Sequence, residues 1–256
     1  MGIINSIMEK LKDYLPQSLE GKNILITGGT TGIGRATALL LAEIGANVMI
    51  AGLNEKHLND TLSDLSGRAA AEVYSVLADL SAKEGIESVF NQVKVHFRNL
   101  DILINNAALA FGTTEEGNYD DWQRVVDTNL TAYIACSAEA VKLMGSEGHI
   151  VNVGSMSADV REETGSVYVA TKSGIKGFSE AFRKQVNKKG IKVTLIEPGA
   201  VDTDMQPKST EQKRKEVDEL KMLTADDIAV SILYCLSQPR RCDVVELKVR
   251  PHLQII

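Results

Sequence analysis

A tyrosine and a lysine in the segment 165–172 have the spacing of a proton-transfer pair. Tyr168 and Lys172 are four positions apart, so on a helix they lie on one face about one turn from each other. A nearby ammonium favours the phenolate and is expected to lower the pKa of a tyrosine from its usual value of about 10. Such a tyrosine can exchange a proton with an alcohol or carbonyl oxygen. The same spacing also occurs on helices with an ordinary solvated lysine, so the meaning of the pair depends on the rest of the chain.

A glycine-rich turn near the amino end has the pattern of a phosphate-binding site. Residues 23–27 predict a short apolar strand, the turn 28–34 follows at once, and residues 35–44 predict a helix closed by Gly45. Free backbone N–H groups and the helix dipole converge where such a helix begins, and glycine allows the backbone to approach a pyrophosphate closely. The order strand, glycine turn, helix therefore favours a dinucleotide site over an ordinary tight turn.

Strands and helices are predicted to alternate along the whole chain. Strands are expected at residues 23–27, 47–51, 72–77, 101–104, 149–153, 193–196 and 244–248. Helices are expected at residues 35–44, 83–97, 127–143, 212–220 and 224–236, and around Tyr168. This alternation predicts an α/β fold, a single doubly wound Rossmann-like domain with a seven-stranded, mainly parallel sheet flanked by helices. Ligands of such sheets bind beyond the carboxyl ends of the strands. Gly28, Asn106, Ser155 and Pro198 all follow a predicted strand and are expected to converge there.

The composition argues against several classes of partner. The net charge of −6 disfavours nucleic acid, because binding to phosphates needs a basic surface. The four histidines are scattered without metal-ligand spacing, so no metal site is expected. The three cysteines form no Cys-x-x-Cys pair, which suits reduced thiols and a cytoplasmic location. No apolar run approaches the length of about 18 residues that a membrane-spanning helix needs.

Residues 1–20 are predicted to form a helical extension that precedes the domain of residues 21–256. Apolar side chains recur on one side of this helix at Ile3, Ile4, Ile7, Met8, Leu11 and Leu15. Asn5, Ser6 and Glu9 interrupt the apolar stretch that a secretory signal requires. We expect the helix to pack on the domain or on a neighbouring subunit in preference to lying on a membrane.

Together these motifs resemble the classical short-chain dehydrogenase/reductase family, over nearly the whole chain from about Gly21. The matching motifs are Thr27-Gly28-x-x-x-Gly32-Ile33-Gly34, Asn105-Asn106-Ala107, Asn129, Ser155, Tyr168-x-x-x-Lys172 and Pro198-Gly199. The resemblance implies an NAD(P)-dependent oxidoreductase that transfers a hydride between nicotinamide and a carbonyl compound or secondary alcohol. It also implies association into a homodimer or homotetramer. The alternative is a catalytically idle dinucleotide-binding protein that regulates a partner, and the complete set of polar site residues favours the enzyme.

The resemblance also implies a role for each site residue. Tyr168 is the acid/base, Lys172 lowers its pKa and binds the nicotinamide ribose, Ser155 donates to the substrate oxygen, and Asn129 holds a water that connects Lys172 to solvent. Contacts to the cofactor are expected from Gly28, Thr30, Thr31, Gly32, Ile33, Gly34, Leu53, Asn54, Asp79, Leu80, Asn106, Ala107, Tyr168, Lys172, Pro198, Gly199, Val201 and Thr203. Contacts to the substrate are expected from Ser155, Met156, Val160 and Tyr168.

The choice between NAD and NADP depends on the end of the second predicted strand. NAD-binding folds usually place an acid there to hold the adenosine ribose, and this chain has Gly52 instead. Members of the family that prefer the phosphate usually carry arginine at the next position, which is Leu53 here. Without an acid nothing repels a 2′-phosphate, and Thr30, Thr31 and Asn54 can hydrogen-bond it. We therefore favour NADP, with NAD as the alternative.

The small-molecule substrate is expected to bind among the segments after strands four, five and six, residues 109–114, 156–163 and 200–223. Leu109, Phe111, Met156 and Val160 predict an apolar pocket. Arg161 either pairs with a substrate carboxylate or is solvated, and we favour the solvated position. The charged helix at 212–220 is expected to act as a mobile lid.

Overall fold

A computed structural model of the chain describes residues 16–68 and 70–254. The amphipathic helix predicted within residues 1–20 falls almost entirely on residues 1–15, which lie outside the described residues. Its existence and its role as an extension therefore stay predictions.

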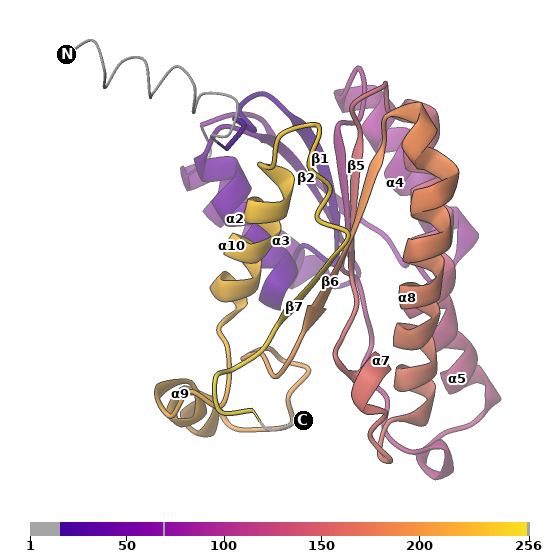
Figure 1. The fold of residues 1–256 in the computed structure, drawn as a ribbon, viewed down its shortest axis with the longest axis vertical. Helices are drawn as coiled ribbons and strands as arrows, with labels where there is room; N and C mark the ends of the chain where they lie inside the picture. The colour runs from indigo at the N-terminus through magenta and orange to yellow at the C-terminus, as the bar shows by residue number, and fades with distance from the viewer. Residues whose placement is uncertain (1–15, 69, 255–256) are drawn as a thin grey trace.

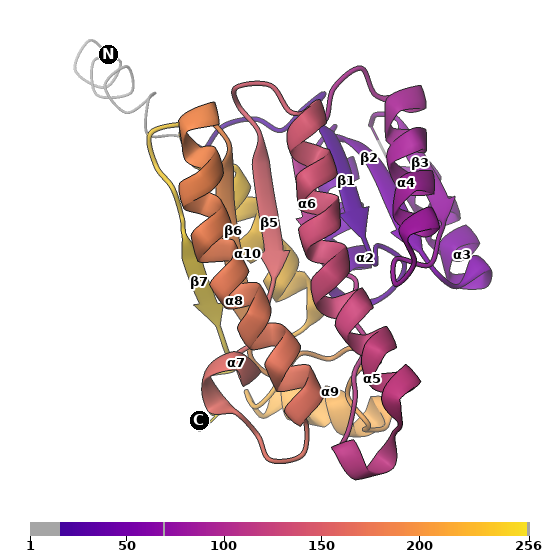
Figure 2. The same ribbon diagram turned by 90° about the vertical axis from the view of Figure 1, so that its right-hand side faces the viewer.

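One parallel sheet of seven strands forms the centre of the described part of the chain (Figures 1 and 2). The strands are β1 (Asn23–Thr27), β2 (Asn47–Gly52), β3 (Val73–Leu77), β4 (Ile102–Asn105), β5 (His149–Val153), β6 (Lys192–Pro198) and β7 (Glu246–Val249). Their order is β3-β2-β1-β4-β5-β6-β7, and every neighbouring pair is parallel. The doubly wound prediction is confirmed. Because the order reverses between β1 and β4, a crevice opens beyond the carboxyl ends of these two strands.

Helices cover both faces of the sheet. In Figure 1 one layer stands to the left of the sheet, formed by α2 (Gly32–Glu43), α3 (Glu55–Arg68) and α10 (Ala225–Leu236). The other layer faces the viewer in Figure 2, formed by α4 (Lys83–His96), α6 (Ala132–Leu143) and α8 (Ser166–Val186). The shorter helices α5 (Tyr119–Val126), α7 (Ser157–Val160) and α9 (Thr210–Asp218) lie beyond the carboxyl ends of the strands, at the bottom of both views.

Side chains of the central strands alternate between the two layers. Ile24 and Ile26 of β1 pack with the α2 and α10 side, whereas Leu25 between them packs with the α4 and α6 side, and all three are fully buried. This alternation is the pleat of a strand buried on both faces, and each such side chain stabilises the fold by about 1.5–3 kcal/mol. The strand ends that carry the candidate site residues are thus held in a rigid frame.

Two helical predictions differ from the structure. Helix α3 was not predicted, because only Leu58, Thr61 and Leu65 of its residues are buried, which leaves a narrow apolar stripe in the sequence. The helix predicted at 127–143 begins earlier, at Tyr119, and contains a π-helical turn at Asp127–Thr131 between α5 and α6. The spacing of apolar residues in the sequence cannot reveal such a turn. Its one extra residue shifts the helical positions of the side chains only locally.

Candidate active site

The glycine turn between β1 and α2 lies tightly against the loop that follows β4. Gly28 and Gly32 have φ angles of 62° and 50°, and a Cβ atom on Gly28 would lie 2.7 Å from the Cα atom of Ala107. A Cβ atom on Gly34 would overlap the carbonyl oxygen of Gly28. These positions need glycine because an L side chain would be strained or would collide with backbone.

Asn106 and Thr27 join the two loops by hydrogen bonds. The Asn106 side-chain amide donates to the carbonyl oxygen of Gly28 at 2.9 Å, and Thr27 Oγ1 accepts from the backbone N–H groups of Asn106 (3.0 Å) and Ala107 (3.2 Å). Thr31, the first flanking residue of α2, makes no side-chain capping hydrogen bond. The N–H groups at the start of this helix are therefore available to an anionic ligand.

A cleft runs along the carboxyl ends of the strands. The part of it that contains the glycine turn, called the glycine-turn half, has a volume of about 350 Å³. The predicted cofactor residues that line it are Gly28, Thr30, Thr31, Gly32, Ile33, Leu53, Asn54, Asp79, Leu80, Asn106, Ala107 and Thr203. His57 and Arg124 also line it and were missed by sequence reasoning. The Arg124 guanidinium lies 3.6 Å from the Asp79 carboxylate, and no pattern around Arg124 indicated that contact.

The end of β2 is closed to an acidic side chain. A Cβ atom on Gly52 would overlap Cγ2 of Thr30, so the glycine is a packing requirement of the neighbouring turn. The two cations near this end have partners: Arg35 pairs with Asp64, and Lys56 Nζ lies 2.8 Å from Asp60. Both cations are therefore engaged in surface ion pairs.

The second part of the cleft, the tyrosine half, has a volume of about 380 Å³. The predicted residues that line it are Ser155, Met156, Val160, Tyr168, Lys172, Pro198, Gly199, Val201 and Thr203. Ile33, Asn106, Ala108, Thr203 and Met205 line both halves, so the two halves adjoin. Gly34 and Asn129 line neither and lie buried beneath them.

Helix α8 carries Tyr168 and Lys172 to the tyrosine half. Its buried stripe continues through Ile175, Ser179 and Phe182, which face the sheet at helical spacing. Tyr168 and Lys172 extend the same stripe toward the carboxyl ends of the strands. The spacing that packs the helix on the sheet therefore also directs the tyrosine and the lysine into the cleft.

The Lys172 ammonium lies over the rings of two tyrosines. Its Nζ atom is 5.5 Å from the centroid of the Tyr168 ring and 5.7 Å from that of Tyr133, and it donates a hydrogen bond to the carbonyl oxygen of Val153 at 3.0 Å. The Ser155 side chain and Tyr168 line the same half of the cleft, and Ser155 acts to lower the pKa of the Tyr168 hydroxyl group. The Ser155 hydroxyl oxygen accepts from the backbone N–H of Ser157 at 3.1 Å, which fixes its position.

The proton affinities of this pair differ from the prediction. Burial raises the pKa of Tyr168 above its ordinary value, the Ser155 side chain opposes this effect, and the Glu162 carboxylate adds to it. Burial also lowers the pKa of Lys172 from 10.5 to about 7. The pKa of Tyr168 thus shifts in the direction opposite to the prediction, because burial of the phenol is the largest cause of its shift.

Asn129 is fully buried in the π-helical turn between α5 and α6. Its side-chain oxygen accepts from the backbone N–H of Leu109 at 2.7 Å, and its side-chain nitrogen donates to the Leu109 carbonyl oxygen at 2.9 Å. The same nitrogen lies 3.3 Å from Thr171 Oγ1 on α8. Asn129 thus connects α8 to the loop after β4, and the water contact predicted for it stays a prediction.

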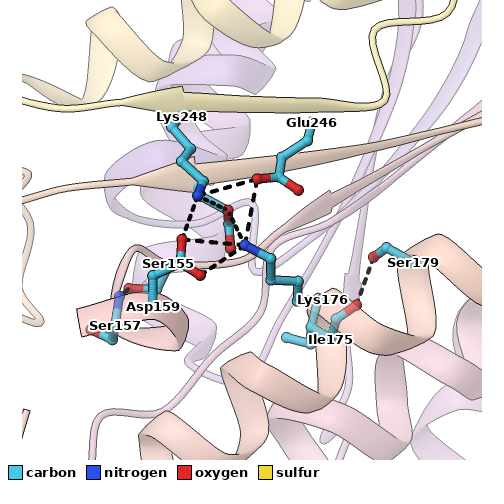
Figure 3. Close-up of polar contacts among 9 residues, drawn as sticks. Ser155, Ser157, Asp159, Ile175, Lys176, Ser179, Glu246 and Lys248 are labelled. Atoms are coloured by element: carbon cyan, nitrogen blue, oxygen red, sulfur yellow. Dashed lines mark hydrogen bonds and ion pairs between the residues drawn. The ribbon is translucent and has the colours of Figure 1, made fainter. Parts of the chain in front are cut away.

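A cluster of charged side chains, the β6–β7 ion cluster, supports the helix that follows Ser155. Figure 3 shows Lys176 and Lys248 close to the carboxylates of Asp159 and Glu246. The third carboxylate of the cluster is that of Glu197. Lys176 Nζ lies 2.9 Å from Asp159, 3.1 Å from Glu197 and 3.4 Å from Glu246. Lys248 pairs with Asp159 as well. The cluster fastens α7 to the ends of β6 and β7, and sequence reasoning missed it because its members come from four separate segments.

Glu197 is the buried member of the β6–β7 ion cluster. Its side chain is 0% exposed, and one of its carboxylate oxygens has no hydrogen-bond partner among the described residues. Burial raises the pKa of Glu197, whereas the hydrogen bond from Lys176 opposes this effect. Glu197 stands directly before Pro198 and Gly199, so the cluster also fixes the strand end that lines the tyrosine half.

The remaining wall of the tyrosine half comes from loops after the strands. Phe111 and Met205 supply apolar surface, Gln254 lines the cleft and accepts a hydrogen bond from the backbone N–H of Ala200 at 3.1 Å, and Glu162 contributes a carboxylate. Arg161 is exposed and does not line the cleft, as favoured from the sequence. Of these residues, Met205, Gln254 and Glu162 had no sequence signal for a site position beyond lying in or near the expected segments.

Helix α9 is tied to the loop after β6. Lys213 is buried, lies 3.1 Å from the Asp202 carboxylate and donates to the carbonyl oxygen of Thr203 at 3.2 Å. Its burial was not predicted, since the helix has the composition of a solvated one. The role of this helix as a mobile lid stays a prediction.

Residues 16–68 and 70–254 contain neither a cluster suited to a metal ion nor a candidate membrane-spanning helix. No cluster of three or more histidine, cysteine, aspartate or glutamate side chains there is arranged to hold a metal ion. None of the helices in this part of the chain combines the length and apolarity required to span a membrane.

Comparison with known proteins agrees with the geometry. Residues 22–214 match the model of the protein family described as short chain dehydrogenase. An uncharacterized oxidoreductase of Staphylococcus epidermidis is 33% identical over 233 residues, which cover 90% of this chain and 97% of the relative. A solved short chain dehydrogenase from Burkholderia cenocepacia J2315 in complex with NADP is similar with a TM-score of 0.83 and 27% identity, covering 92% of this chain and 98% of that one. A blue fluorescent protein from a metagenomic library in complex with NADPH has a TM-score of 0.82 and 26% identity over the same shares of the two chains.

Proposed function

The chain belongs to the short-chain dehydrogenase family of oxidoreductases, and on that premise we propose that it is an NADP-dependent carbonyl reductase in which Tyr168 is the proton donor. The observation that carries this proposal is the meeting of Ser155, Tyr168 and Lys172 in the half of the cleft that adjoins the glycine turn. A carbonyl oxygen bound there would be within reach of the two hydroxyl groups, while its carbon faces the adjoining half.

The residues of the glycine-turn half suit a dinucleotide. The start of α2 offers uncapped N–H groups, and the close contacts of Gly28 and Gly34 leave no side chain between the backbone and a pyrophosphate. When bound, the nicotinamide supplies the hydride that the carbonyl carbon receives. NADP is favoured over NAD because Thr30 fills the space beside Gly52 where a ribose-binding acid would project. Two similar solved structures contain NADP or NADPH, which supports the same choice.

The proton chemistry favours reduction over oxidation. A tyrosine whose pKa is raised stays protonated at neutral pH, so Tyr168 is ready to donate a proton to the oxygen of a carbonyl group. Ser155 would donate a second hydrogen bond to that oxygen and stabilise the negative charge that develops on it. Lys172, with a pKa of about 7, can exist in either protonation state near neutrality, and it would be one of the residues that hold the nicotinamide ribose.

Replacement of Tyr168 by phenylalanine tests the proposal. The Tyr168→Phe variant retains the ring that packs over Lys172 but lacks the hydroxyl group, so we expect turnover to fall by about 10²–10⁴-fold. NADPH oxidation with a panel of ketones and aldehydes would be followed at the nicotinamide absorbance, and NADPH binding by fluorescence titration. Binding should stay close to that of the wild type. Tyr119→Phe, which alters an exposed tyrosine at the start of α5, is the matched control. Substantial turnover by Tyr168→Phe would contradict the proposed role, and lack of turnover by the wild type on every substrate would favour the idle binding protein.

A further inference from the structure

The tyrosine half of the cleft contains one carboxylate that the proposed proton chemistry does not use. Of the charged residues in its lining, Lys172 is only 2% exposed, whereas Glu162 is exposed. Glu162 belongs to the short loop that joins α7 to α8. Among the described residues that line this half, Glu162 is therefore the accessible charge that an approaching substrate meets, and that charge is negative.

Two observations place Glu162 on the same side of the cleft as the Tyr168 hydroxyl group. It lines the same half of the cleft as Tyr168, and its charge adds to the burial that raises the pKa of Tyr168. The Ser157 hydroxyl group donates to Glu162 Oε1 at 3.2 Å. No lysine or arginine among the described residues forms an ion pair with Glu162, so its second oxygen can accept from a ligand.

The position of Glu162 is fixed through α7. Ser157, its hydrogen-bond donor, opens this four-residue helix, and Asp159 in the same helix is held by Lys176 and Lys248 in the β6–β7 ion cluster (Figure 3). A carboxylate held in advance loses little conformational entropy when a ligand binds, which makes its charge effective in selection.

The half of the cleft that Glu162 lines also contains apolar side chains. Phe111, Met156, Val160 and Met205 belong to it. Water screens the exposed carboxylate in the free protein, and an apolar ligand body that displaces this water would strengthen its interaction with a ligand charge. The carboxylate attracts an ammonium or another strong hydrogen-bond donor and repels a second carboxylate.

We infer that Glu162 selects the substrate: the enzyme reduces carbonyl compounds that have an apolar body and an ammonium or comparable donor group, and it discriminates against keto acids. This inference rests on the proposed function, since it names the substrate class of the same site. It also disagrees with the carboxylate-binding alternative for Arg161, whose side chain is exposed and does not line the cleft.

Three ketones with one carbon skeleton test the inference. Their far ends carry an ammonium, a methyl group or a carboxylate, and kcat/KM is measured for each with NADPH. For the wild type we expect the order ammonium, methyl, carboxylate, with the first and last separated by about tenfold to a hundredfold, the range of one charge-assisted hydrogen bond. Glu162→Gln retains an acceptor without the charge and should reduce this separation to within about threefold. Glu162→Lys should reverse the order.

The neighbouring residue Glu163 provides the matched control. It is exposed, does not line the cleft and carries the same charge, so Glu163→Gln changes the net charge of the protein equally. We expect this variant to retain the wild-type separation. Equal kcat/KM for the ammonium and carboxylate ketones in the wild type would overturn the inference, and so would an equal effect of the two glutamine variants.

Failure of the inference can be told from failure of the proposed function. Turnover of the methyl ketone without discrimination by charge would refute the role of Glu162 alone. Absence of turnover with all three ketones and with the wider carbonyl panel would refute the proposed function and the inference together. Thermal unfolding of each variant checks that the loop substitution leaves the fold intact.

Discussion

Replacement of Lys172 by methionine should stabilise the protein while it removes a residue of the site. The lysine side chain is 2% exposed, and burial lowers its pKa from 10.5 to about 7. Below about pH 7 the folded protein must hold a buried ammonium, whereas the unfolded chain holds a solvated one, and this difference costs folding free energy. Methionine has a similar length and carries no charge, so it avoids the cost.

The pH dependence gives the magnitude. Between the folded pKa near 7 and the unfolded value of 10.5, the unfolded chain binds one more proton at Lys172 than the folded protein does. The contribution of this group to the stability of the wild type therefore rises with pH, by about 1.4 kcal/mol per pH unit within that window. The Lys172→Met variant lacks this rise. Its advantage over the wild type should shrink by about 2–3 kcal/mol from about pH 6 to about pH 9, while loss of the hydrogen bond to Val153 costs about 1 kcal/mol at every pH.

Urea unfolding of both proteins without cofactor, at several pH values across this range, measures the difference directly. Lys184→Met serves as the control, because Lys184 is an exposed lysine on the same helix and its charge is solvated in the folded protein. We expect the curve of the control to run parallel to that of the wild type. If the curve of Lys172→Met is parallel too, the buried lysine keeps its charge throughout, and the argument from desolvation is refuted.

Two further predictions concern the cofactor and the β6–β7 ion cluster. Gly52→Asp should cost about 1–3 kcal/mol in urea unfolding because its Cβ atom overlaps Thr30, and addition of Thr30→Ala should recover most of that loss and shift the preference from NADPH toward NADH. Strictly additive effects of the two substitutions would contradict the overlap, and an unchanged cofactor preference would contradict the role of the missing acid. Asp159→Asn should raise KM for the ketone several-fold with a smaller change in kcat, because α7 loses the carboxylate that Lys176 and Lys248 share. An effect no larger than that of Asp218→Asn, on the exposed end of α9, would show that the cluster does not position the cleft.

The part of the site that the sequence predicted consists of residues whose role is imposed by backbone geometry. Gly28 and Gly34 are needed where two chain segments touch, and Ser155 and Pro198 follow strands whose apolar runs are evident. A strand buried on both faces leaves a continuous apolar signal, and a parallel sheet then brings its carboxyl ends together. The position of these residues therefore follows from local pattern and topology alone.

The part that the sequence did not predict depends on contacts between distant segments. The β6–β7 ion cluster joins residues from α7, α8, β6 and β7, and no local pattern links Asp159 to Lys248. The sequence analysis did not single out Glu162, which lines the cleft next to the exposed Arg161, and the backbone at Arg161 adopts a left-handed conformation with φ of 59°. Arginine is an uncommon residue for that conformation, so composition gave no sign that the chain turns there and presents the next side chain to the cleft.

The pKa of Tyr168 is raised, although the spacing of Tyr168 and Lys172 predicted that it is lowered. The structural cause of this difference cannot be read from the spacing. That spacing specifies that Tyr168 and Lys172 share a helix face, but it does not specify how much water reaches them. In the folded protein the face is pressed against Tyr133 and the end of β5, which leaves the ammonium in contact with aromatic rings and one carbonyl oxygen. Desolvation then raises the pKa of the phenol and lowers that of the ammonium, so each group is driven toward its neutral form. A neutral phenol is the form that a carbonyl reduction consumes, and a lysine with a pKa near 7 gives up or takes a proton at little cost. Under the proposed function, the burial that opposes the simple ion-pair argument would be the property that fits the pair for reduction at neutral pH.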